Sequence, residues 1–177
     1  MIGGMNMRVS SHINSSITIR PITMQDFESV LKWSKDDIFC AANDWEKNRG
    51  EQELYTWWDF CVHHPHKDFI RLGITLENDL IGYGDIVVLK EDKAELGIAI
   101  GERSRWGQGI GTRAMMCLMD VAKSHLHMTT FQAETHESNH RAQKMLEKVG
   151  FKEISRVGTE IYMGGECGLV QYSLSII

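Results

Sequence analysis

Three glycines alternate along the segment from Arg105 to Thr112, at positions 107, 109 and 111. A strand-like run from Glu95 to Gly101 precedes them, and a helical pattern from Ile110 to Leu126 follows. Glycine has no Cβ, so successive backbone N–H groups can converge on one bound anion. The first turn of a helix adds unpaired N–H donors and the positive end of the helix dipole. Strand, glycine turn and helix together predict a diphosphate site. A plain tight turn is the alternative.

Two common phosphate-binding motifs do not describe this segment. The lysine-bearing loop G-x-x-x-x-G-K-[ST] is absent from it. The dinucleotide fingerprint G-x-G-x-x-G fails because the third glycine comes one residue early and no acidic ribose partner is placed after a following strand. What remains is G-x-G-x-G after a strand, a pattern that does not by itself select a ligand.

The residues downstream narrow the choice. A strand pattern from Thr129 to His136 is followed by a helical pattern that begins near Asn139 and ends at Gly150. This order resembles the GNAT superfamily of acetyl-CoA-dependent N-acetyltransferases, which carries [RQ]-x-x-G-x-[GA] and, further on, N-x-x-[AS]-x-x-hydrophobic-x-x-K-x-G-F. The resemblance is specific from about Glu95 to Phe151. The downstream motif is matched by Asn139, Ala142, Met145, Lys148, Gly150 and Phe151.

The upstream motif is matched at Gly109 and Gly111, but Trp106 stands where arginine or glutamine is usual. A W-G-x-G-[IY]-[GA]-[TS] loop resembles the branch that includes ribosomal-protein N-terminal acetyltransferases. This resemblance makes a protein N-terminus the first acceptor to expect. A small cationic amine, such as an aminoglycoside or a polyamine, is the close second. A coenzyme A-binding module without transfer activity is the alternative from another class.

The same resemblance implies acetyl-CoA as acyl donor and assigns residues to it. Main-chain groups of Ile98 to Ile100 would bind the pantetheine arm, and free N–H groups there would stabilise a tetrahedral oxyanion. Asn139 matches an asparagine that contacts the arm, although it can also serve as a helix cap. Arg103, Arg105 and Arg113 flank the loop and can each bind a phosphate or remain solvated. The predicted coenzyme site comprises Ile98, Ala99, Ile100, Arg105, Trp106, Gly107, Gln108, Gly109, Ile110, Gly111, Thr112 and Asn139.

Amine acetylation requires a base, because a protonated amine cannot attack a thioester. Gln132, Glu134 and His136 point the same way if their segment is a strand. Glu134 lies five residues before Asn139, the offset at which ribosomal N-terminal acetyltransferases place a catalytic glutamate. We therefore predict Glu134 as general base, acting through water. A solvated or cross-strand-paired carboxylate is the alternative for Glu134. His136 and Glu95 are the other candidate bases.

The general acid has no assigned residue. Many relatives carry a tyrosine directly after the position of Met145, and it protonates the departing thiolate. This chain has Leu146 there. A thiol with a pKa of about 8.5 can leave without help, so the loss is compatible with activity. Tyr162 and Tyr172 are possible substitutes.

The predicted elements suit an α+β fold. The resemblance specifies it as a GNAT-like, mostly antiparallel mixed sheet with helices on both faces. Residues 1–15 are expected to be a disordered lead-in and residues 16–177 a single acetyltransferase domain. The segment 36–50 is ambiguous. Helices are predicted from Thr23 to Lys35, Glu51 to His63, Ile110 to Leu126 and, capped by Ser138, to Val149. Strands are predicted at Ser16–Arg20, Phe69–Leu76, Leu80–Leu89, Ala94–Ile100, Thr129–His136, Phe151–Arg156 and Leu169–Ile177.

Composition limits the class of protein. The net charge of −5 argues against nucleic-acid binding and weakly favours a cationic substrate. Four scattered cysteines without a C-x-x-C pair are expected to be reduced, which favours a cytoplasmic location. No apolar run is long enough to span a bilayer, so no membrane partner is expected. The histidines at 63, 64 and 66 indicate a solvated helix end, and no metal site is predicted. A homodimer is plausible for the family.

Overall fold

The computed structural model describes residues 17–176, and the expected lead-in over residues 1–15 lies outside them. One mixed sheet organises the chain, with strand order β1-β2-β3-β4-β5-β8-β6, and β7 pairs with β8. All neighbouring strands are antiparallel except β4 and β5. The strands are β1 (Ile17–Pro21), β2 (Phe69–Leu76), β3 (Asp79–Lys90), β4 (Lys93–Ile100), β5 (Thr130–His136), β6 (Lys152–Ser155), β7 (Thr159–Tyr162) and β8 (Gly165–Ser175).

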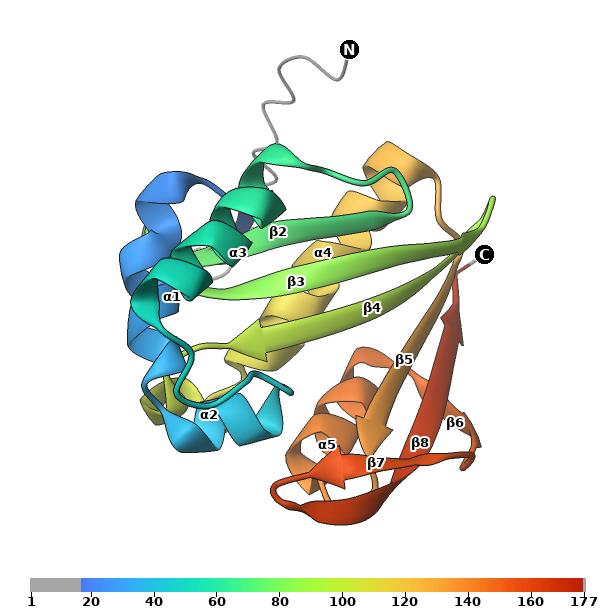
Figure 1. The fold of residues 1–177 in the computed structure, drawn as a ribbon. Coiled ribbons are helices and arrows are strands. Elements are labelled where there is room, and N and C mark those ends of the chain that lie inside the picture. The colour runs from blue at the N-terminus through green and yellow to red at the C-terminus, as the bar shows by residue number, and fades with distance from the viewer. Residues whose placement is uncertain (1–16, 177) are drawn as a thin grey trace.

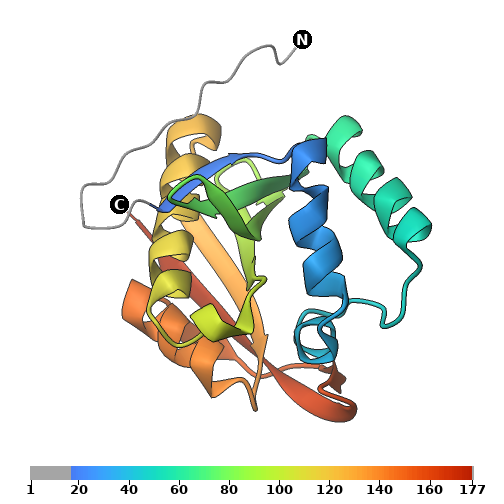
Figure 2. The same cartoon turned by 90° about the vertical axis from the view of Figure 1, so that its left-hand side faces the viewer.

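Helices cover both faces of this sheet, as predicted. The blue and teal helices α1 and α3 lie over one face of β2 to β4, and α4 crosses the opposite face (Figures 1 and 2). α5 packs beside α4 and shares its apolar core with β5 and β8. The helices are η1 (Met24–Asp26), α1 (Phe27–Ser34), α2 (Asp37–Ala42), α3 (Glu51–His63), η2 (Arg103–Arg105), α4 (Ile110–Leu126) and α5 (His140–Val149).

The parallel pair β4–β5 is short. It joins only residues 93–95 to residues 130–132, although both strands continue further. Beyond these residues the two strands diverge, as Figure 1 shows below and to the left of their common origin. Among residues 17–176, the second half of β4, from Leu96 to Ile100, therefore has no partner strand on its β5 side. Apart from the Ile100 carbonyl, which accepts a hydrogen bond from the Trp106 indole, main-chain groups on this side can bind a ligand.

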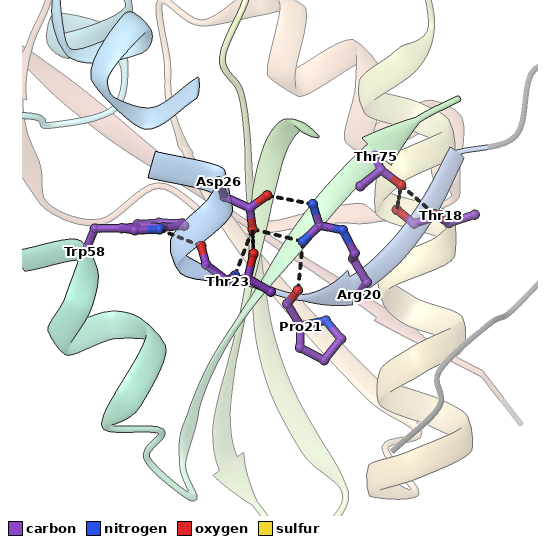
Figure 3. Close-up of polar contacts among 7 residues, drawn as sticks. All are labelled: Thr18, Arg20, Pro21, Thr23, Asp26, Trp58 and Thr75. Atoms are coloured by element: carbon purple, nitrogen blue, oxygen red, sulfur yellow. Dashed lines mark hydrogen bonds and ion pairs between the residues drawn. The ribbon is translucent and has the colours of Figure 1, made fainter. Parts of the chain in front are cut away.

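A cluster of polar side chains connects the first strand to the helices that follow through hydrogen bonds. Arg20 donates to both carboxylate oxygens of Asp26, at 2.9 and 2.6 Å, and the Thr23 backbone N–H donates to the same carboxylate at 2.8 Å. The Trp58 indole donates to the Thr23 carbonyl at 3.0 Å, which ties α3 to this turn (Figure 3). Thr23 and Asp26 form a capping box at the start of η1. Because Asp26 is only 6% exposed, these donors offset the cost of burying its charge.

α1 buries Val30 and Trp33, and the bare backbone of Gly101 leaves room for the Trp33 ring. Two sequence predictions need correction. The cap of α5 is Asn139, not Ser138: its side chain accepts from the Ala142 N–H at 3.2 Å. The last strand begins at Gly165, four residues before the predicted start at Leu169, and β7 was not predicted. A tight turn at Met163 and Gly164, both at positive φ, pairs β7 with the first residues of β8.

Candidate active site

The loop before α4 has the backbone that its glycines predict. Gly107 and Gly109 both have φ of 76°, a left-handed conformation that glycine adopts without strain. Gly109 caps the N-terminus of α4, a helix of 17 residues. A Cβ built on either glycine would meet no other atom within 4 Å. The loop therefore presents its backbone to open space at the positive end of a long helix, as an anion site requires.

That open space is a cavity of about 350 Å³. Its walls come from the unpaired end of β4, the glycine loop, the start of α4, one face of α5 and the end of α2. The lining residues are Ala42, Asn43, Ile98, Ala99, Ile100, Arg105, Trp106, Gly107, Gly109, Gly111, Thr112, Asn139, Arg141, Ala142, Lys144, Met145 and Lys148. The cavity thus brings together a strand end, a loop and helices that are far apart in the sequence.

All but two of the predicted coenzyme residues line this cavity. Gln108 does not, because its side-chain amide turns back and donates to the Ser104 carbonyl at 2.6 Å. Ile110 is 4% exposed and belongs to the apolar core under α4. Asn139 both lines the cavity and caps α5, so the two interpretations of this residue coexist.

The positive charges at the cavity differ from those that the sequence suggested. Arg103 and Arg105 are paired with Asp36 and Glu102, at 2.6 and 2.9 Å. Arg113 is not among the lining residues. Besides Arg105, the cavity is lined by three cations of α5, namely Arg141, Lys144 and Lys148. Their spacing of three and four residues puts them on one helix face, and this spacing was the overlooked signal.

The donor set suits the diphosphate of coenzyme A. Backbone amides at a helix N-terminus, open glycines and nearby cations are the groups that bind phosphate oxygens in proteins. The partnerless edge of β4 borders the same cavity and offers main-chain hydrogen bonds to an extended arm. The residues present therefore match both chemical parts of the coenzyme, the anionic head and the amide-bearing arm.

Glu134 lies on the face of the sheet opposite the buried side chains of β5. Phe131, Ala133 and Thr135 are buried, whereas Glu134 is exposed, so β5 alternates as predicted. Glu95 is the register partner of Gln132 and therefore shares the face of Glu134. We call the surface of Glu95, Gly97 and Glu134 the acceptor face. A Cβ on Gly97 would meet nothing within 4 Å, so this face is open above β4.

The two carboxylates of the acceptor face influence each other. Burial first, and the charge of Glu134 second, raise the pKa of the Glu95 carboxyl above its ordinary value. A second negative charge close to the first is unfavourable unless a cation or a proton compensates it. The acceptor face therefore favours a ligand that brings a positive charge.

Gln171 holds the Glu134 carboxylate in place. Its side-chain N–H₂ donates to Glu134 Oε2 at 2.7 Å and to the Val157 carbonyl at 2.8 Å. Its side-chain oxygen accepts from Ser155 Oγ at 2.8 Å and from the Val157 N–H at 3.0 Å. Sequence reasoning missed Gln171 because the contact depends on the β5–β8 register, in which Glu134 faces Gln171.

The remaining candidates for proton transfer have different environments. His136 stacks on Tyr162, with ring centroids 4.1 Å apart, and its buried Nε2 lies 3.5 Å from a Glu160 carboxylate oxygen. Tyr172 is 1% exposed and belongs to the main core, where its hydroxyl has no hydrogen-bond partner among the described residues. Leu146 is 2% exposed in the same core. Of the two tyrosines, Tyr172 and not Tyr162 is buried in the main core.

Comparisons with known proteins agree with this geometry. Residues 16–152 match the family model described as acetyltransferase (GNAT) domain. An uncharacterized protein of Methanocaldococcus jannaschii is 29% identical over 147 residues, or 81% of this chain and 29% of that protein. Human alpha/beta-tubulin-N-acetyltransferase 9 is 22% identical over 139 residues, or 76% of this chain and 58% of that protein. The chain thus spans about 29% and 58% of the lengths of these two relatives.

Solved structures share the fold at low sequence identity. Spermidine N-acetyltransferase from Vibrio cholerae, in complex with CoA and spermine, has a TM-score of 0.76 and 16% identity, with coverage of 90% of this chain and 95% of that one. A domain from Methanocaldococcus jannaschii has a TM-score of 0.69 and 24% identity, with coverage of 92% and 100%. The described part of this chain has no helix with the length and apolarity needed to cross a membrane.

Proposed function

This chain belongs to the GNAT family of acetyltransferases, and we propose that it transfers the acetyl group of acetyl-CoA to the α-amino group of a polypeptide. One observation carries the proposal. The strands β4 and β5 diverge after residues 95 and 132, with the glycine-loop cavity at the end of β4 and Glu134 on β5 across from it. A donor held in the cavity and an amine held at Glu134 would meet between the two strands.

Each part of the site has a role in this reaction. Acetyl-CoA supplies the thioester carbonyl, to which the amine nitrogen bonds as the carbon–sulfur bond breaks. Glu134 accepts the proton that the amine loses, through a water molecule, and its free oxygen Oε1 is available because Gln171 occupies Oε2. Main-chain N–H groups near Ile98 to Ile100 stabilise the oxyanion. The thiolate can depart with help from Tyr162 or without it.

The open acceptor face supports a polypeptide acceptor. Glu95, Gly97 and Glu134 are all exposed, and Gly97 has open space above it, so a chain that continues beyond its amino terminus can be accommodated. The human relative's name describes tubulin as its acceptor, which supports a protein substrate here as well. An ammonium group in the acceptor also offsets the paired carboxylates of this face.

A small cationic amine is the second candidate. The facing carboxylates Glu95 and Glu134 would suit a polyamine or an aminoglycoside as well as a protein N-terminus. A coenzyme A-binding module without transfer is the third, and it is favoured by the buried Leu146 in place of a tyrosine. The three candidates differ in which amines become acetylated, so a matched acceptor panel separates them.

The test measures thiol release from acetyl-CoA with four acceptors. Two are forms of one lysine-containing peptide, with its N-terminus free or blocked, and the others are spermidine and an aminoglycoside. We expect release only with the free peptide. Release with spermidine or the aminoglycoside alone would favour the second candidate. Coenzyme A binding without release from any acceptor would overturn the enzyme assignment and favour the module.

The Glu134→Gln variant tests the base. We expect unchanged coenzyme A affinity and a fall in kcat of about 10²- to 10³-fold. The control is Glu153→Gln, which removes an exposed carboxylate of β6 that pairs with Arg156 away from the cavity. Equal activities of the two variants would contradict the role of Glu134.

A further inference from the structure

Trp106 connects two sides of the coenzyme cavity. Its indole N–H donates to the carbonyl of Ile100, the last residue of β4, at 2.8 Å. The guanidinium carbon of Arg141, in the first turn of α5, lies 4.0 Å from the centroid of its ring. Both residues line the cavity. The tryptophan side chain thus fixes the end of β4 on one side and a cation on the other.

Arg141 differs from the other arginines of this region. Arg103 and Arg105 give their guanidinium groups to carboxylates. Among residues 17–176, no carboxylate forms an ion pair or hydrogen bond with Arg141, and its side chain is exposed. Five N–H donors in the guanidinium plane therefore remain available while the face of the group rests on the indole. Stacking leaves these in-plane donors free, because a cation–π contact uses the face of the guanidinium.

We propose that Arg141 is a clamp for the diphosphate of coenzyme A and that Trp106 is the residue that positions it. This proposal rests on acetyl-CoA being the acyl donor. The glycine loop would bind the diphosphate from one side through backbone amides, and Arg141 would bind it from the α5 side through a bidentate contact. The tryptophan takes the place of the arginine or glutamine usual at this loop position, so a cation from α5 replaces one from the loop.

A positioned arginine and a general positive field predict different results. Lys144 lines the same cavity one turn further along α5, and no aromatic ring among the described residues makes a cation–π contact with it. If charge alone matters, loss of Lys144 will weaken coenzyme binding as much as loss of Arg141 does. If Arg141 is a positioned clamp, its replacement will weaken coenzyme binding more than replacement of Lys144 does. Removal of the Trp106 ring will then reproduce much of the effect of losing Arg141.

The experiment measures coenzyme A and dephospho-coenzyme A binding to the full chain by calorimetry. We expect Arg141→Gln to weaken both ligands by about 10-fold or more, because both contain the diphosphate. Lys144→Gln is the charge-matched control and should weaken coenzyme A binding less than Arg141→Gln does. Equal losses in the two variants would overturn the clamp. A loss in Arg141→Gln that disappears with dephospho-coenzyme A would assign the arginine to the 3′-phosphate and overturn the proposal.

Two variants of the tryptophan test positioning. Trp106→Phe keeps an aromatic face but removes the hydrogen bond to Ile100, and we expect binding within about twofold of wild type. Trp106→Leu removes the face, and we expect a loss of about 3- to 10-fold that is not additive with Arg141→Gln. Equal losses in the Phe and Leu variants would show that the Ile100 contact, not the stack, matters, and would overturn the positioning role.

Coenzyme A binding and acetyl transfer by the wild-type protein distinguish failure of this proposal from failure of the proposed function. A wild type that binds no coenzyme A would refute acetyl transfer itself. A wild type that binds and transfers, while Arg141→Gln and Trp106→Leu bind equally well, would refute the clamp alone. Arg141 is exposed and its substitution leaves the core intact, so unfolding does not confound the binding measurement on Arg141→Gln. The thermal midpoint of each variant is recorded as a check.

Discussion

Replacement of Gly109 by alanine should lower the stability of the protein and its coenzyme affinity through two separate effects. Gly109 has φ of 76° and caps α4. A residue with a Cβ costs about 1–2 kcal/mol in this left-handed conformation. For a chain of this size, each kcal/mol lowers the midpoint of thermal unfolding by about 2–4 °C. We therefore expect a fall of about 2–8 °C, measured by thermal unfolding monitored by circular dichroism.

The second effect concerns the coenzyme. The new Cβ meets no protein atom within 4 Å, and the loop faces the cavity, so the methyl group occupies space that the diphosphate needs. Loss of one hydrogen bond to a charged group costs about 1.5–3 kcal/mol. That cost corresponds to a rise of about 10- to 150-fold in the Kd for coenzyme A. Calorimetric titration with coenzyme A measures it directly.

Gly164→Ala is the matched control. Gly164 also has positive φ, at 87°, and open space around an added Cβ, but it lies in the β7–β8 turn outside the cavity lining. It should lose a similar amount of stability and keep its coenzyme affinity. If Gly109→Ala bound coenzyme A as tightly as Gly164→Ala, the diphosphate would not lie against the loop, and the assignment of the cavity would be wrong.

Three further predictions follow from the geometry. Gln171→Leu removes a donor to Glu134 and should lower kcat about fivefold with little change in coenzyme Kd; a steady-state assay with an unchanged kcat would contradict the positioning of Glu134. Tyr172→Phe removes a buried hydroxyl without a partner among the described residues, so urea unfolding should show equal or higher stability, and kcat should not change; a fall in kcat would implicate Tyr172 as acid. Hydrogen bonds from Lys32 and Arg105 hold the pKa of Glu102 below its ordinary value, so Glu102→Gln should cost up to about 1 kcal/mol at pH 7. A lowered folded-state pKa gives stability that is complete above the unfolded value of about 4.3 and disappears as pH falls through the folded value. The stabilities of the two proteins should therefore converge once the pH lies below the folded-state pKa; a difference that stays constant with pH would contradict the assignment.

The elements around the glycine loop were predicted from local signals in the sequence. Within the loop, Gly107 and Gly109 have positive φ, a conformation that glycine adopts without strain. The helices at Glu51–His63 and Ile110–Leu126 have the predicted bounds, since apolar periodicity and end signals agree there. The residues that line the cavity from β4 and the loop follow directly from these elements.

Contacts that depend on strand register could not be read from the sequence. The β7–β8 pairing was missed because Gly164 and Gly165 also suit an irregular connection, and only the partner strand decides between the two. Gln171 faces Glu134 only in the observed β5–β8 register, and a shift of one residue would turn its side chain to the opposite face. The support of the candidate base is therefore a property of the sheet rather than of a motif.

The same reasoning explains why the cations of α5 at the cavity were not identified from the sequence. Arginines beside a glycine loop are the nearest candidates along the chain, but Asp36 and Glu102 are also close in space and pair with Arg103 and Arg105. The Arg103–Asp36 pair joins η2 to the start of α2, the Arg105–Glu102 pair is local to η2, and both leave less positive charge for a ligand. α5 is distant in sequence yet packs beside α4, so its cations, which have no ion-pair partner among residues 17–176, reach the cavity. A cation's availability, not its distance along the chain, determines whether it can bind the coenzyme, and availability depends on which carboxylates the fold brings near it.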